Sequence, residues 1–402
     1  MLRIKKGNKL PLIFVLYALY LAFTYLQGFI PFPGIFTSIC QYGVILLGVI
    51  SLLWKKQMKF SAYIAWGAAF ILMMGLSLFY TPNASFAIAQ GILPFVIQWL
   101  LNWAIYYQSR SRKELEILAH IYIIVGAVFC MVCILFHTED LFNGGRFGYS
   151  VNRNPNEVVL QMLLPASFAF FYAFRKPRVD WRYLSLAILF TALMLLTGSK
   201  KSILILLIPL VMVIRKSGIR RLRYIMIGIG VLIAGVYLMF SVEAFYNSFG
   251  IRFEQLLSAM SDGGNGAESD YVRFAMRAEA FRLFLKNPIL GNGCESFREL
   301  SGFGTYSHNN YTEILCSYGI VGAAIYYSLP VAYLVQAVKS KAQMSRDNMS
   351  LIIGLLLVYF LFDWGSVTIF SRYNMFLFMY VPMVYRYYQP KKNMKKRRRR
   401  IK

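Results

Sequence analysis

One long polar segment interrupts this otherwise apolar chain, and it ends in the run Ser307-His-Asn-Asn-Tyr-Thr-Glu-Ile-Leu-Cys-Ser-Tyr-Gly-Ile-Val-Gly322. The segment begins at Glu243 and is about eighty residues long. It contains a loose Gly- and Ser-rich run, then a stretch that mixes arginines with apolar residues, then the turn Asn287-Pro-Ile-Leu-Gly-Asn-Gly293. Arginines, a turn and a histidine therefore gather directly ahead of an apolar block.

The rest of the chain is typical of a membrane protein. Hydrophobic residues make up 58% and charged residues 15% of the 402 positions, which is outside the range of soluble domains. A helix needs about 20 apolar residues to cross a hydrocarbon core of about 30 Å. About twelve blocks meet or approach this length, at residues 10–28, 35–54, 61–80, 85–107, 115–136, 157–174, 183–198, 201–214, 224–242, 309–336, 349–363 and 371–388.

These blocks predict an all-α polytopic membrane protein with about 12 transmembrane helices and one large extracytoplasmic loop. The predicted parts are helices one to nine in 1–242, the large loop in 243–308, helices ten to twelve in 309–388, and a basic cytoplasmic tail in 389–402. The first block lacks a small-residue cleavage site, so we expect a retained helix rather than a signal peptide.

The positions of the basic residues support this count, because short cytoplasmic loops carry most Lys and Arg. With the N-terminus inside, most of the 43 basic residues fall in the inner segments 3–9, 55–59, 110–113, 175–182, 215–223, 339–346 and from 386 on. Topology thus explains the net charge of +26, and nucleic acid is not an expected partner. The run 395–400 is expected at anionic lipid headgroups, with both termini cytoplasmic.

The cysteines and the acidic residues predict neither disulfides nor a metal site. Four of the five cysteines fall in apolar blocks and Cys294 alone in an outer loop. Cys130 and Cys133 have the spacing of a metal-binding pair, but no second pair or nearby histidine completes four ligands. The acidic run at 262–270 does not follow the pattern of a calcium loop.

Two outer segments carry cations that could contact an anionic substrate. The loop 137–157 concentrates Gly, Asn and aromatic residues around Arg146 and Arg153, side chains that line carbohydrate and phosphate sites. Its alternative interpretation is a solvated loop.

Lys200 and Lys201 follow Leu196-Thr-Gly-Ser with almost no loop, so they lie near the outer membrane boundary. They either face an anionic ligand or snorkel to the headgroups.

Residues 271–286 predict a helix with a basic and an apolar side. The predicted apolar side consists of Phe274, Phe281 and either Phe284 or Leu285. Arg273 and Arg277 lie one turn apart, about 5–6 Å at Cβ, which allows two guanidinium groups to bind adjacent phosphates of one diphosphate. A solvated helix face that contacts headgroups is the alternative.

His308 stands where the tenth apolar block begins, with Ser307 or Asn309 available as the N-cap. The positive end of a helix dipole favours neutral imidazole, which can accept a proton from a hydroxyl group near pH 7. His120 lies within the fifth block and His137 at its outer end, so both suit structural roles.

Three stretches in this order resemble motifs of the bacterial O-antigen ligase and polysaccharide polymerase family. The run from Ser307 to Gly322 is similar to the family's "HN…L…GxxG" signature. Arg273 followed by Pro288-Ile-Leu-Gly-Asn-Gly293 resembles its arginine, helix and "P-[IL]-L-G-x-G" turn. Leu196-Thr-Gly-Ser-Lys200 resembles its "TGSR" turn, with lysine in place of arginine. Lysine keeps the charge but loses the bidentate fork, so Lys201 or Arg146 is expected to share that role.

The resemblance implies a metal-independent, inverting glycosyltransferase of the membrane-embedded GT-C-like type, without a cofactor. It would act on undecaprenyl-diphosphate-linked oligosaccharide at the outer face of the bacterial plasma membrane. By position, Arg273 would bind the diphosphate and His308 would act as general base; Arg277, Lys200 and Lys201 are further expected diphosphate contacts.

We therefore predict a polymerase that joins lipid-linked repeat units of a capsule, exopolysaccharide or O-antigen. An O-antigen ligase that transfers a finished glycan to a lipid A core or another acceptor is the alternative within the same chemistry. Asn309, Arg146 and Arg153 are candidate glycan or phosphate contacts, and a flippase and a chain-length regulator are the expected protein partners. A lipid-linked sugar flippase is the alternative of another class, but it predicts mid-membrane charges and repeated halves that the sequence does not show.

Overall fold

The computed structural model describes residues 10–55, 61–142, 147–148, 154–216, 218–251, 254, 268–339 and 345–388. Within these ranges the chain is helical and contains no strand. The elements, including π-helical η1 and η3 and 3-10 helical η2, are α1 (Leu12–Leu26), α2 (Ile35–Lys55), α3 (Ala62–Ser77), α4 (Ala84–Phe86), η1 (Ala87–Ile92), α5 (Leu93–Gln108), α6 (Arg112–Phe136), α7 (Thr138–Phe142), α8 (Pro155–Phe174), α9 (Trp181–Leu196), η2 (Lys200–Leu206), α10 (Leu207–Ile214), α11 (Gly218–Ser241), α12 (Glu243–Phe245), η3 (Tyr246–Gly250), α14 (Glu268–Lys286), α15 (Ser296–Leu300), α16 (Asn310–Lys339), α17 (Arg346–Asp363) and α18 (Arg372–Tyr388).

Every predicted apolar block coincides with a helix or with consecutive helices. Six helical spans among the described residues are long and apolar enough to cross a membrane: Ile35–Trp54, Ala84–Gln108, Arg112–Phe136, Pro155–Phe174, Arg221–Ser241 and Asn310–Lys339. The helices α1, α3 and α9 are apolar but shorter. The chain is thus an all-helical polytopic membrane protein, and the number of twelve spans remains a prediction.

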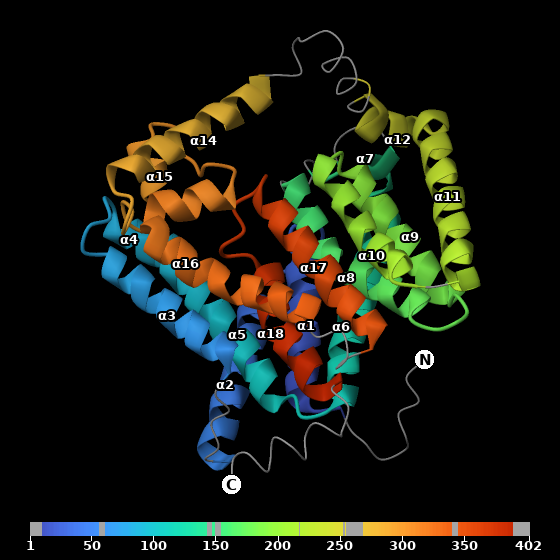
Figure 1. The fold of residues 1–402 in the computed structure, drawn as a ribbon, viewed down its shortest axis with the longest axis horizontal. Coiled ribbons are helices and arrows are strands. Elements are labelled where there is room, and N and C mark those ends of the chain that lie inside the picture. Colours follow the sequence, from blue (N-terminus) through green and yellow to red (C-terminus); the bar gives the residue numbers. More distant parts are fainter. Residues whose placement is uncertain are drawn as a thin grey trace.

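The predicted inner loops contact one another. Glu116, at the start of α6, accepts a hydrogen bond from Tyr388 at 3.1 Å and lies 3.6 Å from the guanidinium of Arg175. Lys216, after α10, forms an ion pair with Asp347 at the start of α17. The predicted outer elements α7, α12, α14 and α15 gather at the upper end of the molecule in Figure 1. The connections predicted to lie inside and those predicted to lie outside therefore form two separate groups in the structure, as the distribution of Lys and Arg predicted.

The helices α6, α8 and α18 form the centre of the bundle (Figure 1). Phe168 of α8 packs against Phe376 and Tyr380 of α18, with ring centroids 6.2 and 5.2 Å apart. In contrast, α11 lies at the edge and exposes large apolar side chains such as Ile233 and Tyr237. Exposed apolar side chains on a peripheral helix are expected where a helix faces lipid.

The helix α16 is broken at Gly319, where φ is 62° and ψ is −163°, a conformation that only glycine adopts readily. The turn after α14 fills the break. Asn292 and Gly293 donate their backbone N–H groups to Cys316 and Ser317 at 2.8 and 2.9 Å, while Ile320 donates to Pro288 at 2.9 Å. Backbone groups released by a break in a membrane helix need new partners, and this turn supplies them. The predicted tenth block is therefore two helical pieces joined by a docked turn.

The predicted apolar side of α14 was wrong. Phe274, Phe281 and Leu285 are 63%, 48% and 60% exposed, and of the predicted set only Phe284 is buried. The buried side is instead a stripe of smaller residues, Met276, Ala280 and Leu283, which packs against Phe297 and Cys316. Close approach of α14 to α15 and α16 favours the smaller side chains, so the large aromatic rings turn outward.

The outer loop at 80–85 also supports the docked turn. Tyr80 donates its hydroxyl to the carbonyl of Leu290 at 3.0 Å, and Thr81 donates to that of Cys294 at 2.7 Å. A Cβ atom on Gly293 would overlap Thr81. The loop, the turn and the break in α16 thus form one continuous support beneath α14.

Candidate functional site

His308 lies in a strained position at the start of α16, with φ of 57° in the left-handed region. The residues on both sides are fixed. The N–H of Ser307 donates to the carboxylate of Glu313 at 2.7 Å, and the hydroxyl of Ser307 donates to the carbonyl of Asn309 at 3.0 Å. The side-chain oxygen of Asn309 accepts from the N–H of Thr312 at 3.0 Å, so of the two predicted candidates, Ser307 and Asn309, it is Asn309 that caps the helix. These bonds hold the backbone of His308 in a conformation that it would otherwise rarely adopt.

The imidazole of His308 is half-buried beside Tyr306, with ring centroids 4.5 Å apart. Burial, followed by the positive charges of Arg273 and Lys201, lowers the pKa of His308 to about 4. The ring is therefore neutral at pH 7, and burial and the two cations account for the neutral form that was expected at this helix start. A neutral ring has a nitrogen available to accept a proton.

Arg273, Lys201 and His308 come from three distant stretches, and the structure brings them together. Arg273 lies in the first half of α14 and is half-buried. Its charge acts on His308, on Lys201 and on the Tyr306 hydroxyl, whose pKa is raised chiefly by burial. The docked turn that ends α14 fixes this arrangement, because it anchors α14 to the same helix that begins beside His308.

Lys201 points inward and Lys200 does not. The Lys201 ammonium group donates hydrogen bonds to the carbonyl of Gly365 and the hydroxyl of Ser366, and it lies 5.1 Å from the ring centroid of Phe362. Each of these groups is uncharged, so a bound anion would supply the counter-charge that favours the protonated form of Lys201. Lys200, the residue that the family motif matches, is exposed. The charge of this turn that acts on His308 is thus that of the second lysine.

The local geometry of the turn explains why the two lysines diverge. Gly198 has φ of 59°, which reverses the chain directly after α9. The hydroxyl of Ser199 then donates to Asn156 at 2.7 Å and accepts from the N–H of Lys201 at 3.4 Å. These bonds fix the first turn of η2 against α8. Because Lys200 and Lys201 are consecutive residues of η2, their side chains point in different directions.

A buried polar network joins the start of α16 to the connection between α17 and α18, residues 364–371. The side-chain oxygen of Asn310 accepts the N–H groups of Thr368 and Ile369, both at 3.0 Å, and its amide nitrogen donates to Asp363 at 2.8 Å. Asn309 donates to the carbonyl of Trp364 at 2.9 Å. Both asparagines that follow His308 are thus engaged within the protein. Asp363 and this connection were not among the predicted site residues, because Asp363 ends an apolar block with no motif around it.

The other predicted residues are placed as follows. Arg277 lies one turn beyond Arg273 and is half-buried, and its charge is not among those that act on His308 in the described part of the chain. Arg146 and Arg153 lie outside the described residues. His120 bonds Glu116 and Tyr183, which confirms its structural role.

His137 also has the predicted structural role, because its ring bonds the carbonyl of Phe29 at 2.7 Å. All five cysteines are buried and unpaired. Across the described ranges, no three His, Cys, Asp or Glu side chains gather as potential metal ligands. The functional groups that the structure brings together are therefore two cations, a neutral imidazole and a phenol. They can bind an anion and accept a proton beside it.

Residues 184–327 match a family model described as O-antigen ligase. The matched region includes the lysine turn, Arg273, the docked turn and His308, so the resemblance recognised from short motifs is confirmed over that region. Among curated proteins, none matches the chain.

Proposed function

The chain carries an O-antigen ligase domain at residues 184–327, and from this premise we propose that it is a membrane polysaccharide polymerase. In this proposal it joins oligosaccharide repeat units that are linked to undecaprenyl diphosphate, on the outer face of the bacterial plasma membrane. The observation that carries the proposal is the convergence of Arg273 and Lys201 on the neutral imidazole of His308.

Arg273 and Lys201 would bind the diphosphate of the donor. A guanidinium group can form two parallel hydrogen bonds to phosphate, and an ammonium group adds a point charge. As the glycosidic bond breaks, negative charge grows on the departing phosphate oxygen. Cations already in place stabilise that charge most strongly in the transition state, and this increases the rate of the chemical step.

His308 would accept the proton of the attacking hydroxyl. The acceptor oxygen forms a bond to the anomeric carbon, and the bond from that carbon to the phosphate oxygen breaks with its electron pair leaving on undecaprenyl diphosphate. The hydroxyl proton passes to a ring nitrogen of His308. Attack opposite the leaving group inverts the configuration at the anomeric carbon.

The same two cations link donor binding to the basicity of His308. Without an anion, their positive charges help to keep the pKa of His308 near 4, which makes its neutral form a weak base. A bound diphosphate offsets these charges, so the pKa should rise toward the ordinary value of about 6.5. His308 would then become an effective base only when the donor is present.

The experiment is turnover by the purified protein in proteoliposomes, with a radiolabelled undecaprenyl-diphosphate-linked repeat unit as the substrate. We expect a ladder of longer lipid-linked chains and release of undecaprenyl diphosphate. Transfer only to an added lipid A core would establish the ligase alternative instead. Movement of the substrate between leaflets without a new glycosidic bond would establish a flippase and refute the proposed transferase activity.

A further inference from the structure

A cavity of about 640 Å³ lies beside the end of the α17–α18 connection. Helices α1, α2, α5, α6, α8 and α18 contribute to its wall, together with η1 and the end of the connection itself. Its volume is within the range of about 300–1,000 Å³ that small-molecule sites occupy. None of these elements falls in the matched family region, residues 184–327, so the cavity lies outside it.

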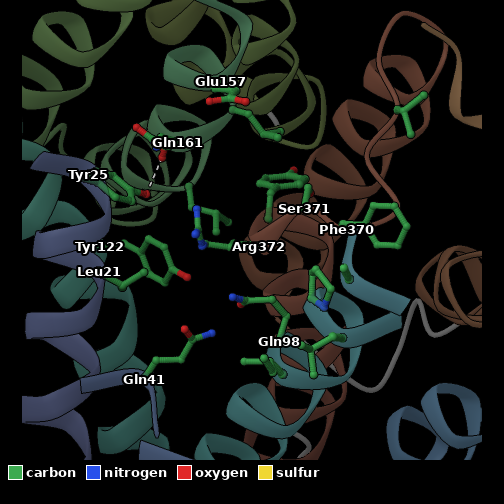
Figure 2. Close-up of a pocket in the computed structure, with 18 residues that line it drawn as sticks. Leu21, Tyr25, Gln41, Gln98, Tyr122, Glu157, Gln161, Phe370, Ser371 and Arg372 are labelled. Atoms are coloured by element: carbon green, nitrogen blue, oxygen red, sulfur yellow. Dashed lines mark hydrogen bonds between the residues drawn. The ribbon is translucent and has the colours of Figure 1, made fainter. Parts of the chain in front are cut away.

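The cavity contains a charged side chain that the proposed mechanism does not use. Arg372 begins α18 and projects into the space between α1 and α5 (Figure 2). Its Nε donates to the hydroxyl of Tyr20 at 2.9 Å. More than a third of the side-chain surface remains accessible, although helices surround it, because that surface faces the cavity. An ionised residue inside a membrane bundle is costly, which makes it a candidate for function.

Amide side chains line the same cavity. Figure 2 shows Gln41 and Gln98 at one end, Glu157 at the other, and Arg372 between them. Gln98 is only 7% exposed and donates to Tyr20 at 2.8 Å, and its carbonyl oxygen has no hydrogen-bond partner among the described residues. A buried amide oxygen without a partner is unfavourable unless a ligand or water satisfies it.

The charges in the cavity indicate what it binds. Arg372 and Glu157 are its charged lining residues, so the lining has no net charge. A diphosphate would require an excess of positive charge, and an isoprenyl chain would leave the guanidinium and amide groups without partners. Hydroxyl groups both donate and accept hydrogen bonds, and they match amide, guanidinium and carboxylate groups together.

The cavity is also close to the proposed reaction centre. Glu157 acts electrostatically on both Arg372 and Tyr306, and Tyr306 packs against His308. The α17–α18 connection contacts both sites: Lys201 binds its Gly365 and Ser366, while its Val367, Phe370 and Ser371 line the cavity. In an inverting displacement the attacking hydroxyl approaches from the side opposite the leaving diphosphate.

We propose that this cavity binds the acceptor carbohydrate, with Arg372 and Gln98 bonding hydroxyl groups of the sugars next to the attacking one. This inference rests on the proposed function. It assigns the donor diphosphate and the acceptor glycan to opposite sides of residues 364–371.

The test uses photo-crosslinking with the full-length protein in proteoliposomes. An azido group is placed on the ring of Phe370, which lines the cavity, or of Phe79, which is 89% exposed and serves as the control. The probe is a tritiated, lipid-free oligosaccharide of one repeat unit. We expect label at Phe370 and none at Phe79, and no protection of Phe370 by inorganic pyrophosphate.

Three outcomes would overturn the inference. Absence of label at Phe370 would mean that the cavity holds only water. Labelling of Phe370 by radioactive undecaprenyl phosphate would assign the cavity to the lipid. Protection of Phe370 from the oligosaccharide probe by pyrophosphate would assign the cavity to the diphosphate. An azido group at Tyr306 tests the donor site with the lipid-linked substrate. Label at Tyr306 without label at Phe370 would reject the inference alone, whereas no label at either position would reject the proposed function as well.

Substitution of Arg372 gives an independent measurement. Arg372→Gln should raise the KM for the lipid-free acceptor about tenfold or more, since a hydrogen bond to a charged group has about that effect, while the KM for the donor stays near the parental value. Arg372→Lys, which retains the charge, should recover part of the loss. If Arg372→Gln raises the donor KM instead, the acceptor assignment is wrong.

Discussion

Gly293 donates its backbone N–H to the carbonyl of Ser317 at 2.9 Å, across the break in α16. This bond connects the end of the helix that carries Arg273 to the helix that begins beside His308. Arg273 is about twenty residues before Gly293 and about thirty-five before His308 in sequence. The spacing between the proposed diphosphate contact and the proposed base therefore depends on the backbone of this junction more than on any side chain.

Substitution of Gly319 should disrupt that junction. A Cβ atom at Gly319 would overlap the carbonyl of Ile289, and the backbone conformation is one that alanine rarely adopts. Gly319→Ala should destabilise the fold by about 1–3 kcal/mol and reduce elongation at the same time. Thermal unfolding in detergent and elongation in proteoliposomes measure the two effects. Gly235→Ala is the matched control, since nothing lies within 4 Å of its added Cβ; equal effects at both positions would contradict the role of the break.

The two lysines after α9 should differ in importance. Lys201 points toward the α17–α18 connection and its charge acts on His308, whereas Lys200 is exposed. Lys201→Ala should therefore lower donor affinity and elongation by at least about tenfold, and Lys200→Ala by much less. Donor binding and elongation are measured on both variants. A larger loss for Lys200→Ala would restore the assignment that the family motif gives.

Much of the fold was predictable from the sequence because lipid imposes a simple rule: apolar residues must continue for a whole span. The helix predicted at 271–286, which the structure shows as α14 (Glu268–Lys286), and its end before Asn287-Pro288 followed from local rules as well, since the residue before proline leaves the helical region. Lys200, Lys201 and His308 were found because each is a polar residue at a membrane boundary, where its presence needs an explanation, whereas Arg273 was found from its spacing to Arg277 and from the family motif.

The parts that sequence reasoning missed depend on contacts between distant segments. The break at Gly319 is invisible in an apolar run, because a single glycine is compatible with a membrane helix. The buried side of α14 was misjudged because the largest apolar residues were assumed to face inward, whereas close packing selected Met276 and Ala280. Arg372 was available as a signal, since it is a charged residue at the start of an apolar block, but only the structure shows the cavity that it enters.

The two arginines of α14 should also be unequal. Arg273 acts on His308, and Arg277 is not among the charges that do so. Arg273→Ala should reduce both donor affinity and turnover, and Arg273→Lys should recover only part of them, because lysine lacks the bidentate fork. Arg277→Ala is predicted to be milder in the same donor-binding and elongation assays. Equal losses would indicate that both arginines bind the diphosphate, as the spacing alone predicted.

The pH dependence of the protein without donor should report the low pKa of His308. The neutral base is the dominant form above about pH 4 and is lost as the pH falls through that value. Arg273→Gln removes a positive charge that favours the neutral ring, so the pKa of His308 should rise toward its ordinary value of about 6.5. NMR of protein with labelled histidine measures this shift, because the chain contains only 3 histidines and His308→Ala assigns the signal. A pKa that falls or stays constant in Arg273→Gln would contradict the proposed coupling.

Replacement of the base itself should separate binding from chemistry. His308→Ala leaves Arg273 and Lys201 in place, so the purified variant should bind the lipid-linked donor nearly as the parent does. A positioned general base contributes about 10²–10⁴-fold, so elongation should slow by at least about a hundredfold. His120→Ala is the matched control, because His120 bonds Glu116 and Tyr183 away from the site and should affect stability more than turnover. If His308→Ala elongates at the parental rate in a folded, inserted protein, proton acceptance must be assigned elsewhere. Glu295 is then the next candidate, since burial raises the pKa of its carboxyl group and brings it closer to the range of a useful base.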